Sequence, residues 1–217
     1  MKRNLFSNQQ DYIDAGPLEP FLIFSLTAAV SNSGTNSTKT SNGPVYIGSD
    51  TAAVDGYDPS IPVIFSNATT SLVASYVRAL YDEIKLLPAT NSSHAAAFVD
   101  GEVVAPGVYN IVSAVSMAGT IYFDAQGDSN AVWVLQVEGA CALGAAVKMV
   151  LRNKALASNI FIVCVGAYSA GAGCDVKGTV ISYSGAIATG AGCDVEGRLI
   201  AMTGAITTSN SVFSLPS

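Results

Sequence analysis

The chain has 217 residues, half of them apolar and only 12% charged, against about 25% charged in an average globular protein. That length suits one domain with a substantial core. The formal net charge of −6 argues against a nucleic-acid partner, which needs a basic surface to neutralise phosphates. Every apolar run stays below the roughly 18–20 residues of a membrane-spanning helix, so we predict no membrane span.

The N-terminal part is expected to hold an arm, two strands and a cap. Residues 1–16 are expected to form a polar tail, or an arm that orders only against a partner. Basic residues open this arm, but no apolar segment follows them, so no secretory signal is predicted. Residues 21–30 and 45–48 are rich in strand-forming side chains and are predicted strands. The irregular stretch at about 49–65 is predicted to cap one end of the fold.

One amphipathic helix is predicted over about residues 70–87. Its apolar side chains recur at spacings of three and four residues, which places them on one stripe. Thr69 or Thr70 is expected to cap its start, and Pro88 to end it. Such a stripe needs an apolar surface to lie on. The stripe consists of Val73, Tyr76, Val77, Leu80, Ile84 and Leu87.

Strands and turns are expected after the helix. Residues 90–102 are predicted to be a linker that holds the single histidine, His94, which we interpret as a surface residue. Residues 151–158 are expected to be a loop between coils. Predicted strands and coils occupy residues 106–109, 120–123, 131–137, 139–150 and 159–165.

The C-terminal tract repeats itself after 19 residues. Gly171 to Gly178 (GAGCDVKG) returns as Gly190 to Gly197 (GAGCDVEG). A fixed period near 20 residues, rich in glycine, alanine and β-branched residues, is typical of stacked coils. Each coil is too small to bury its own apolar side, so it must lie on a neighbour. We therefore predict a mainly β fold, a parallel β-solenoid.

Because side chains alternate inward and outward along a strand, the coils can be sorted face by face. On the first face, five rows align, from Ala114-Val115-Ser116-Met117 to Ala205-Ile206-Thr207-Thr208. Their second and fourth positions are mostly large and apolar and should point inward. The first and third positions then form a flat, uncharged candidate binding face with two columns: Ala114, Ala140, Ala167, Ala186, Ala205, and Ser116, Ala142, Ser169, Ala188, Thr207.

The other two predicted faces differ in charge. The second stacks Asp175 over Asp194 and Lys177 over Glu196, and we interpret it as a solvated face. The third contains residues 180–183 and 199–202 and is apolar on both sides. A wall that is apolar on both sides needs cover, and we expect the helix to supply it.

Four cysteines lie in the repeat half, and two of them occupy equivalent positions of successive coils. Cys174 and Cys193 should therefore stack about 4.8 Å apart. A disulfide is sterically conceivable there, but buried free thiols that fill the core are the favoured interpretation. Zinc-ligand spacing, phosphate loops and dinucleotide motifs are absent from the sequence. We predict neither metal nor cofactor.

Several landmarks follow one another along the chain: residues 21–34, 45–48, the helix, Pro106-Gly107-Val108-Tyr109, 130–137, 159–161 and 197–201. In this order they resemble the ice-binding-protein-like family, across about residues 17–213. The resemblance implies a right-handed, three-sided parallel β-solenoid with one long α-helix packed along one side. It also implies that residues 17–217 form a single domain in which N-terminal strands join the stack beside the C-terminal coils.

Two functions fit these expectations. The resemblance and the flat face favour a non-enzymatic, antifreeze-type protein whose partner is ice or ordered water. The alternative is a structural or assembly module, such as a surface, adhesin or virion component, whose flat face docks on another protein surface. The arm at residues 1–16 would then assist assembly. The resemblance favours an extracellular or surface location, including a virion surface.

An enzyme is a third hypothesis. Some β-solenoids cleave polysaccharides with clustered acids, and Asp175 and Asp194 are stacked carboxylates. Stacked acids alone are poor acid–base machinery, however, because catalysis needs a proton donor and a proton acceptor with separated pKa values. We therefore predict no catalytic residues.

Overall fold

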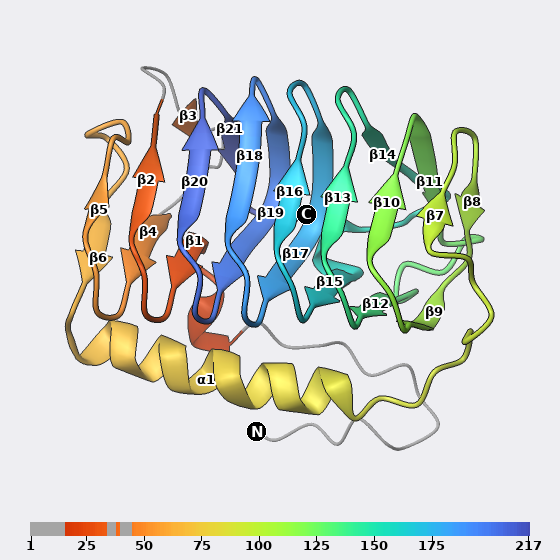
Figure 1. Ribbon diagram of the computed structural model, residues 1–217, viewed down its shortest axis with the longest axis horizontal. Coiled ribbons are helices and arrows are strands. Elements are labelled where there is room, and N and C mark those ends of the chain that lie inside the picture. Colours follow the sequence, from red (N-terminus) through yellow and green to blue (C-terminus); the bar gives the residue numbers. More distant parts are fainter. Residues whose placement is uncertain (1–15, 34–37, 40–44) are drawn as a thin grey trace.

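A computed structural model describes residues 16–33, 38–39 and 45–217 of the chain. The predicted arm lies outside these residues, apart from Gly16. The described part is mainly β, with parallel strand pairs and one α-helix, α1 (Ala68–Lys85). The predicted parallel β-solenoid with a helix along one side is confirmed (Figure 1). The handedness of the coils and a three-sided cross-section stay predictions.

One sheet, which we call the flat ladder, has eight parallel strands. Figure 1 shows them side by side across the front of the molecule, above α1. Strands that are far apart in sequence become neighbours, since β2 pairs with β20. From one end to the other, the flat ladder contains β5 (Val54–Asp55), β2 (Val30–Asn32), β20 (Ile206–Ser209), β18 (Ile187–Ala191), β16 (Tyr168–Ala170), β13 (Cys141–Leu143), β10 (Val115–Met117) and β7 (Ala97–Phe98).

The second sheet divides at two long strands, β17 (Asp175–Ser182) and β19 (Asp194–Ala201). Their first halves pair with one set of strands and their second halves with another, on either side of Gly178 and Gly197. The first set forms what we call the charged ladder. Besides the first halves of β17 and β19, it contains β3 (Thr38–Lys39), β21 (Val212–Ser214), β14 (Lys148–Arg152), β11 (Thr120–Asp124) and β8 (Val103–Val104).

The second set forms the covered ladder, on which α1 packs. Its N-terminal strands insert beside the C-terminal coils, as β1 pairs with β19 on one side and β4 on the other. This arrangement was implied by the family resemblance and is confirmed. Besides the second halves of β17 and β19, the ladder contains β6 (Val63–Phe65), β4 (Tyr46–Ser49), β1 (Phe21–Ser25), β15 (Ile160–Cys164), β12 (Trp133–Val137) and β9 (Gly107–Ile111).

The boundaries of α1 differ from the prediction by two residues at each end. The Asn67 side chain caps the helix by accepting hydrogen bonds from the backbone amides of Thr69 and Thr70, at 2.9 and 3.0 Å. Asn67 is the better cap because its amide oxygen reaches both amides at once. The helix ends at Lys85, before Leu87, which precedes Pro88 and is therefore disfavoured in the helical conformation.

The apolar stripe of α1 packs on the outer side of the covered ladder. Val73, Val77 and Ile84 are fully buried there and share one apolar cluster with ladder residues such as Ile181 and Ile200. This confirms that the third face is apolar on both sides and is covered by the helix. The end of α1 is also tied by hydrogen bonds, because the buried Gln136 amide donates to the carbonyls of Ile84 (2.7 Å) and Leu87 (3.1 Å).

A second apolar cluster fills the interior of the coils. Trp133, Tyr168 and Phe213 are fully buried in it. Its thiols include Cys174 and Cys193, and the four cysteines of the chain are all buried and free, which confirms the interpretation as core-filling thiols. Burial raises the pKa of the Cys174 thiol, so it resists ionisation.

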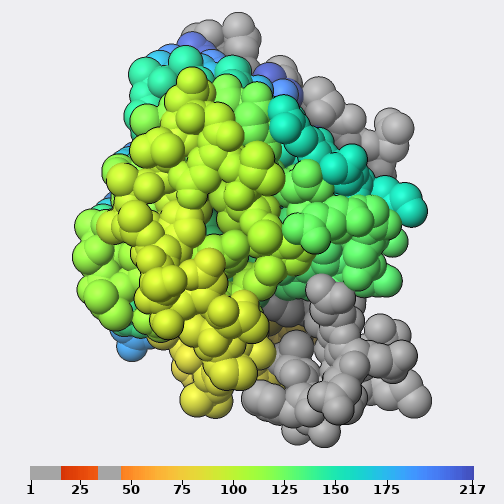
Figure 2. All heavy atoms as spheres, turned by 90° about the vertical axis from the view of Figure 1, so that its right-hand side faces the viewer, coloured from red at the N-terminus to blue at the C-terminus, as the bar shows by residue number. Residues whose placement is uncertain are grey.

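Two segments differ from their predictions. The predicted strand at 21–30 is two strands, because the chain turns a corner after β1 and enters the flat ladder as β2. The predicted linker at 90–102 contains β7, the last strand of the flat ladder. There, His94 stacks on Phe98 (ring centroids 4.2 Å apart), and its Nε2 lies 2.7 Å from a Glu102 oxygen. Figure 2 shows this end of the stack face on.

Candidate binding face

The flat ladder alternates buried and exposed side chains as the five aligned rows predict. The second-position residues Val115, Cys141, Tyr168, Ile187 and Ile206 are in register on successive strands. They are all buried at 2% exposure or less, so each row is anchored through its large side chain. The third positions between them point outward and are exposed.

The third positions make a straight outward column. Strand pairing places Ser116, Ala142, Ser169, Ala188 and Thr207 directly one above another. The column continues beyond these rows at both ends of the ladder. The register adds Ala97 from β7, Ser31 from β2 and Asp55 from β5.

The first positions make a second outward column, formed of alanines. The carbonyl oxygens of Ala140, Ala167, Ala186 and Ala205 each accept a hydrogen bond from the backbone amide that follows the preceding alanine of the column, at 2.8–3.0 Å. Ala114 starts the series. Ala29 and Ala53 extend it in the same way, accepting from the amides of Ile206 and Val30. The alanines are exposed or half-buried.

Glycines hold neighbouring coils together where the chain enters this face. A Cβ at Gly185 would lie 2.2 Å from the Ala167 nitrogen, and one at Gly166 would lie 2.9 Å from the Ala140 nitrogen. A Cβ at Gly139 would lie 2.6 Å from the Ala114 nitrogen, and one at Gly204 would lie 2.1 Å from the Gly185 oxygen. Real side chains do not approach backbone atoms so closely. A corner made of glycine therefore lets the rows stack directly, at the strand spacing of about 4.8 Å.

The face is nearly free of charge. Within the described part of the chain, Asp55 at one end is the sole charged residue in the two columns. The fourth-position hydroxyls point inward, where Thr208 donates to the Asn32 amide oxygen at 3.1 Å, and Thr189 lies 3.2 Å from the Ser211 hydroxyl. These polar groups form their hydrogen bonds inside the coils. The side chains that project from the face are therefore small and give it an even surface.

The charged ladder presents a different surface. Asp175 pairs in register with Asp194, and Lys177 with Glu196, as predicted. The Lys177 ammonium lies 3.2 Å from a Glu196 carboxylate oxygen. Lys148 from the preceding coil lies 3.0 Å from Asp175 and offsets the repulsion between the two stacked acids. This side is a mosaic of half-buried ion pairs.

The five rows aligned from the sequence do not include strands β7, β2 and β5 of the flat ladder. Their segments lack the Gly-Ala pair that marks the other corners, and two of them have only two residues in the strand. A usable signal was an alanine followed by an apolar residue: Ala29-Val30 and Ala53-Val54 repeat the start of the predicted rows. With these strands, the candidate face extends across the full length of the stack.

The arrangement suits binding by shape. Small side chains in register form a rigid, even surface that needs no ordering when it meets another ordered surface. Among the described residues, no group of three or more His, Cys, Asp or Glu side chains could hold a metal ion. The coils, the flanking helix and the exposed face place the chain among parallel β-solenoid proteins.

Comparison with known proteins defines the family. A family model described as Ice-binding-like matches residues 21–214. A curated ice-binding protein of Flavobacterium frigoris (strain PS1) is 26% identical over 130 residues, which are 60% of this chain and 46% of that protein. The chain therefore belongs to the ice-binding-like family.

Solved structures share the fold. An ice binding protein from an Antarctic Flavobacteriaceae bacterium superposes with a TM-score of 0.89 and 28% identity, over 95% of this chain and 48% of that one. One from the Antarctic ascomycete Antarctomyces psychrotrophicus superposes with a TM-score of 0.82 and 24% identity, over 92% and 96% of the chains. The chain spans about half the length of the Flavobacterium and Flavobacteriaceae proteins. In its described part, no helix is long and apolar enough to cross a membrane.

Proposed function

We propose that the chain binds ice through the flat face, defined as the two outward columns of the flat ladder. One observation carries the proposal: small, almost uncharged side chains stand in register on successive strands of the ladder. Family membership supports it, as do the relatives described above, which are ice-binding proteins. Such a protein acts without catalysis, outside the cell or at its surface.

Water beside the methyl groups of the flat face would link this face to ice. A methyl group cannot hydrogen-bond the water beside it, so that water bonds to other water and is ordered over the surface. The hydroxyls of Ser116, Ser169 and Thr207 interrupt the methyl groups and can anchor some of these waters. Because strands repeat about every 4.8 Å along the stack, the ordered waters repeat as well. A repeating layer of water can join the surface of a growing crystal, whereas a mobile or charged surface disturbs it.

The test is ice growth in the presence of the purified chain. At micromolar concentration, the wild type should shape ice crystals, show thermal hysteresis and inhibit recrystallisation. Ala186→Tyr places a bulky ring in the middle of the alanine column and should remove most of this activity. Because Ala186 is exposed, the variant should keep its circular dichroism spectrum and melting temperature.

The contrary outcome is equally clear. If the folded wild type leaves ice crystals unshaped and does not inhibit recrystallisation, ice binding is wrong. The alternative of a structural or assembly module would then be tested on the same sample by its mass in solution. In that case Ala186→Tyr should disrupt assembly, because alanine columns allow another protein surface to approach closely.

A further inference from the structure

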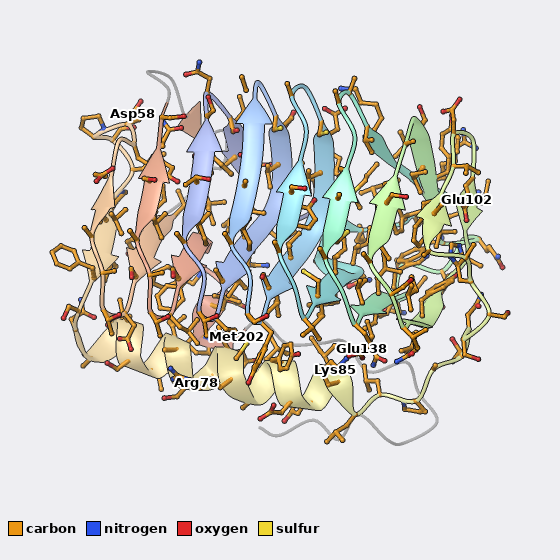
Figure 3. The ribbon with its side chains drawn as sticks, in the orientation of Figure 1. Asp58, Arg78, Lys85, Glu102, Glu138 and Met202 are labelled. Carbon is orange, nitrogen blue, oxygen red and sulfur yellow. The ribbon has the colours of Figure 1, made fainter. Side chains whose placement is uncertain are left out.

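A small groove lies where α1 runs beside the turns that lead into the flat ladder. Figure 3 shows Arg78 on the helix and Met202 at the adjacent ends of the strands. The groove has a volume of about 260 Å³. It is lined by Leu26, Thr27, Arg78, Asp82, Tyr183, Met202 and Thr203.

The floor and one wall of the groove are apolar and rigid. Leu26 and Met202 are buried at 1% and 7% exposure and belong to the cluster beneath α1. Tyr183 remains 44% exposed, although its ring stacks on the buried Tyr81 ring with centroids 4.9 Å apart. An aromatic ring held from behind in this way offers a firm platform to a ligand with an apolar face.

The rim of the groove is polar and offers both hydrogen-bond donors and acceptors. The Thr203 hydroxyl donates to the Tyr183 carbonyl at 3.0 Å, and Thr27 donates to the Met202 carbonyl at 3.3 Å. Their hydrogens are thus engaged inside the turn, while their oxygens remain available as acceptors. Arg78 and Asp82, one helical turn apart, add guanidinium donors and a carboxylate. Neither forms an ion pair with another described residue.

We propose that this groove binds a single neutral pyranose ring, either a free sugar or the terminal unit of a glycan. Sugar hydroxyls donate and accept at once, so they can use both the guanidinium and the carboxylate. The C–H face of the ring would lie on Tyr183. The volume is below the roughly 300–1,000 Å³ of sites for drug-sized ligands, which limits the ligand to one ring. One cation and one anion on the rim disfavour a ligand of strong net charge.

The site leaves the flat face open. Thr27 and Thr203 are each two residues before an alanine of the first column, Ala29 and Ala205. A bound sugar would therefore lie beside the candidate ice-binding surface and not on it. The inference does not rest on ice binding, and its test does not use ice.

The experiment is a titration followed by two-dimensional NMR of the ¹⁵N-labelled chain. Methyl glycosides of glucose, mannose and galactose are added singly, followed by an oligosaccharide that ends in the best of the three. Backbone amides of Thr27, Arg78 and Thr203 should shift in a saturable way with a Kd on the order of 1 mM. Tighter binding of the oligosaccharide assigns the site to a glycan end, and equal affinity assigns it to a free sugar.

Matched variants decide whether the groove is responsible. Arg78→Ala and Asp82→Asn should each weaken binding roughly tenfold, since each removes a hydrogen bond to a charged group. Glu83→Gln on the same helix and Arg152→Ala on the charged ladder change the same charges outside the groove and should leave the affinity unchanged. The proposal is overturned if no methyl glycoside shifts these amides, or if Arg78→Ala and Asp82→Asn bind like the wild type.

Discussion

The flat ladder and the charged ladder are two outer sides of the same coils, yet they present opposite surfaces. Both are built of parallel strands in register, and both send large apolar side chains into one interior. Outward, the flat ladder shows alanine, serine and threonine. The charged ladder shows ion pairs such as Lys148 with Asp175 and Lys177 with Glu196.

The comparison separates what the backbone does from what the side chains do. Stacking alone makes both surfaces regular, so regularity cannot distinguish them. Long charged side chains move and hold water around their own charges, whereas an alanine methyl group has no torsion that could move it out of line. The difference in surface chemistry is therefore the reason for proposing the flat ladder, and not the charged ladder, as the ice-binding surface. The covered ladder has a third kind of outer surface, in which apolar outward side chains are buried under α1.

The largest expected effect is a loss of stability when a buried side chain of α1 is removed from the covered ladder. Ile84→Ala removes a fully buried side chain of α1 over the covered ladder and should lower the free energy of unfolding by about 3 kcal/mol. Leu72→Ala on the same helix removes a side chain that is 60% exposed, and the change should stay within about 0.5 kcal/mol. Chemical denaturation measures both. Equal losses would mean that the helix is not held by its buried stripe.

A smaller effect is expected at the corner of the flat ladder. In Gly185→Ala the new Cβ would meet the backbone of Ala167 at 2.2 Å, and moving two coils apart should cost about 2 kcal/mol. Gly144→Ala is the matched control, because the nearest atom to its new Cβ is 3.6 Å away, and we expect a change within about 0.5 kcal/mol. Thermal melts of the two variants compare them directly. A melt of Gly185→Ala equal to that of Gly144→Ala would show that the corner does not enforce the stacking.

Much of this architecture was predictable because the sequence repeats. The 19-residue step between Cys174 and Cys193 fixes which residues stack, and alternation along each strand then sorts inward from outward side chains. The same step made the pairs Asp175–Asp194 and Lys177–Glu196 predictable. The helix stripe was equally clear, because its 3.6-residue period needs no knowledge of the rest of the fold.

The rest depends on contacts between segments that are distant in sequence. The residues around Val30 do not predict its pairing with Ile206, because that pairing depends on the whole stack. Residues 97–98 make a strand only because Ser116 and Met117 offer an edge to pair with. The groove between Thr27, Arg78 and Tyr183 brings together three separate regions of the chain, so no local pattern could predict it. The binding role of the flat face stays a prediction that measurement must test.

The smallest expected effect is a change of melting temperature with pH, which should distinguish the charged ladder from the flat ladder. Burial disfavours the charged form of Glu196, but hydrogen bonds from the Ser217 amide and from Lys177 outweigh it and hold its pKa below the ordinary 4.5. The unfolded chain therefore binds the proton more readily, and this stability is present above pH 4.5 and lost as the pH falls through the folded pKa. Melting temperatures should decline slightly over that range, and less in Lys177→Met.

The five predicted rows of the flat face, which exclude Asp55 at its end, should not respond to the same titration. Their ten predicted residues carry no titratable side chain, so thermal hysteresis per folded molecule should stay constant while the melting temperature declines. Thermal hysteresis that instead follows the protonation of Glu196 would place the active surface on the charged ladder.

The central claim, that ice is bound by the flat ladder and not by the charged ladder, is tested most directly by a matched pair of tyrosine variants. Ala188 and Asp194 are both exposed and lie in β18 and β19, which follow each other along the chain but belong to the flat and the charged ladder. The measurement is the fraction of fluorescently labelled protein taken up by a slowly growing ice hemisphere. We predict that Ala188→Tyr is largely excluded from the ice, while Asp194→Tyr is incorporated like the wild type. Exclusion of Asp194→Tyr together with normal uptake of Ala188→Tyr would contradict the account.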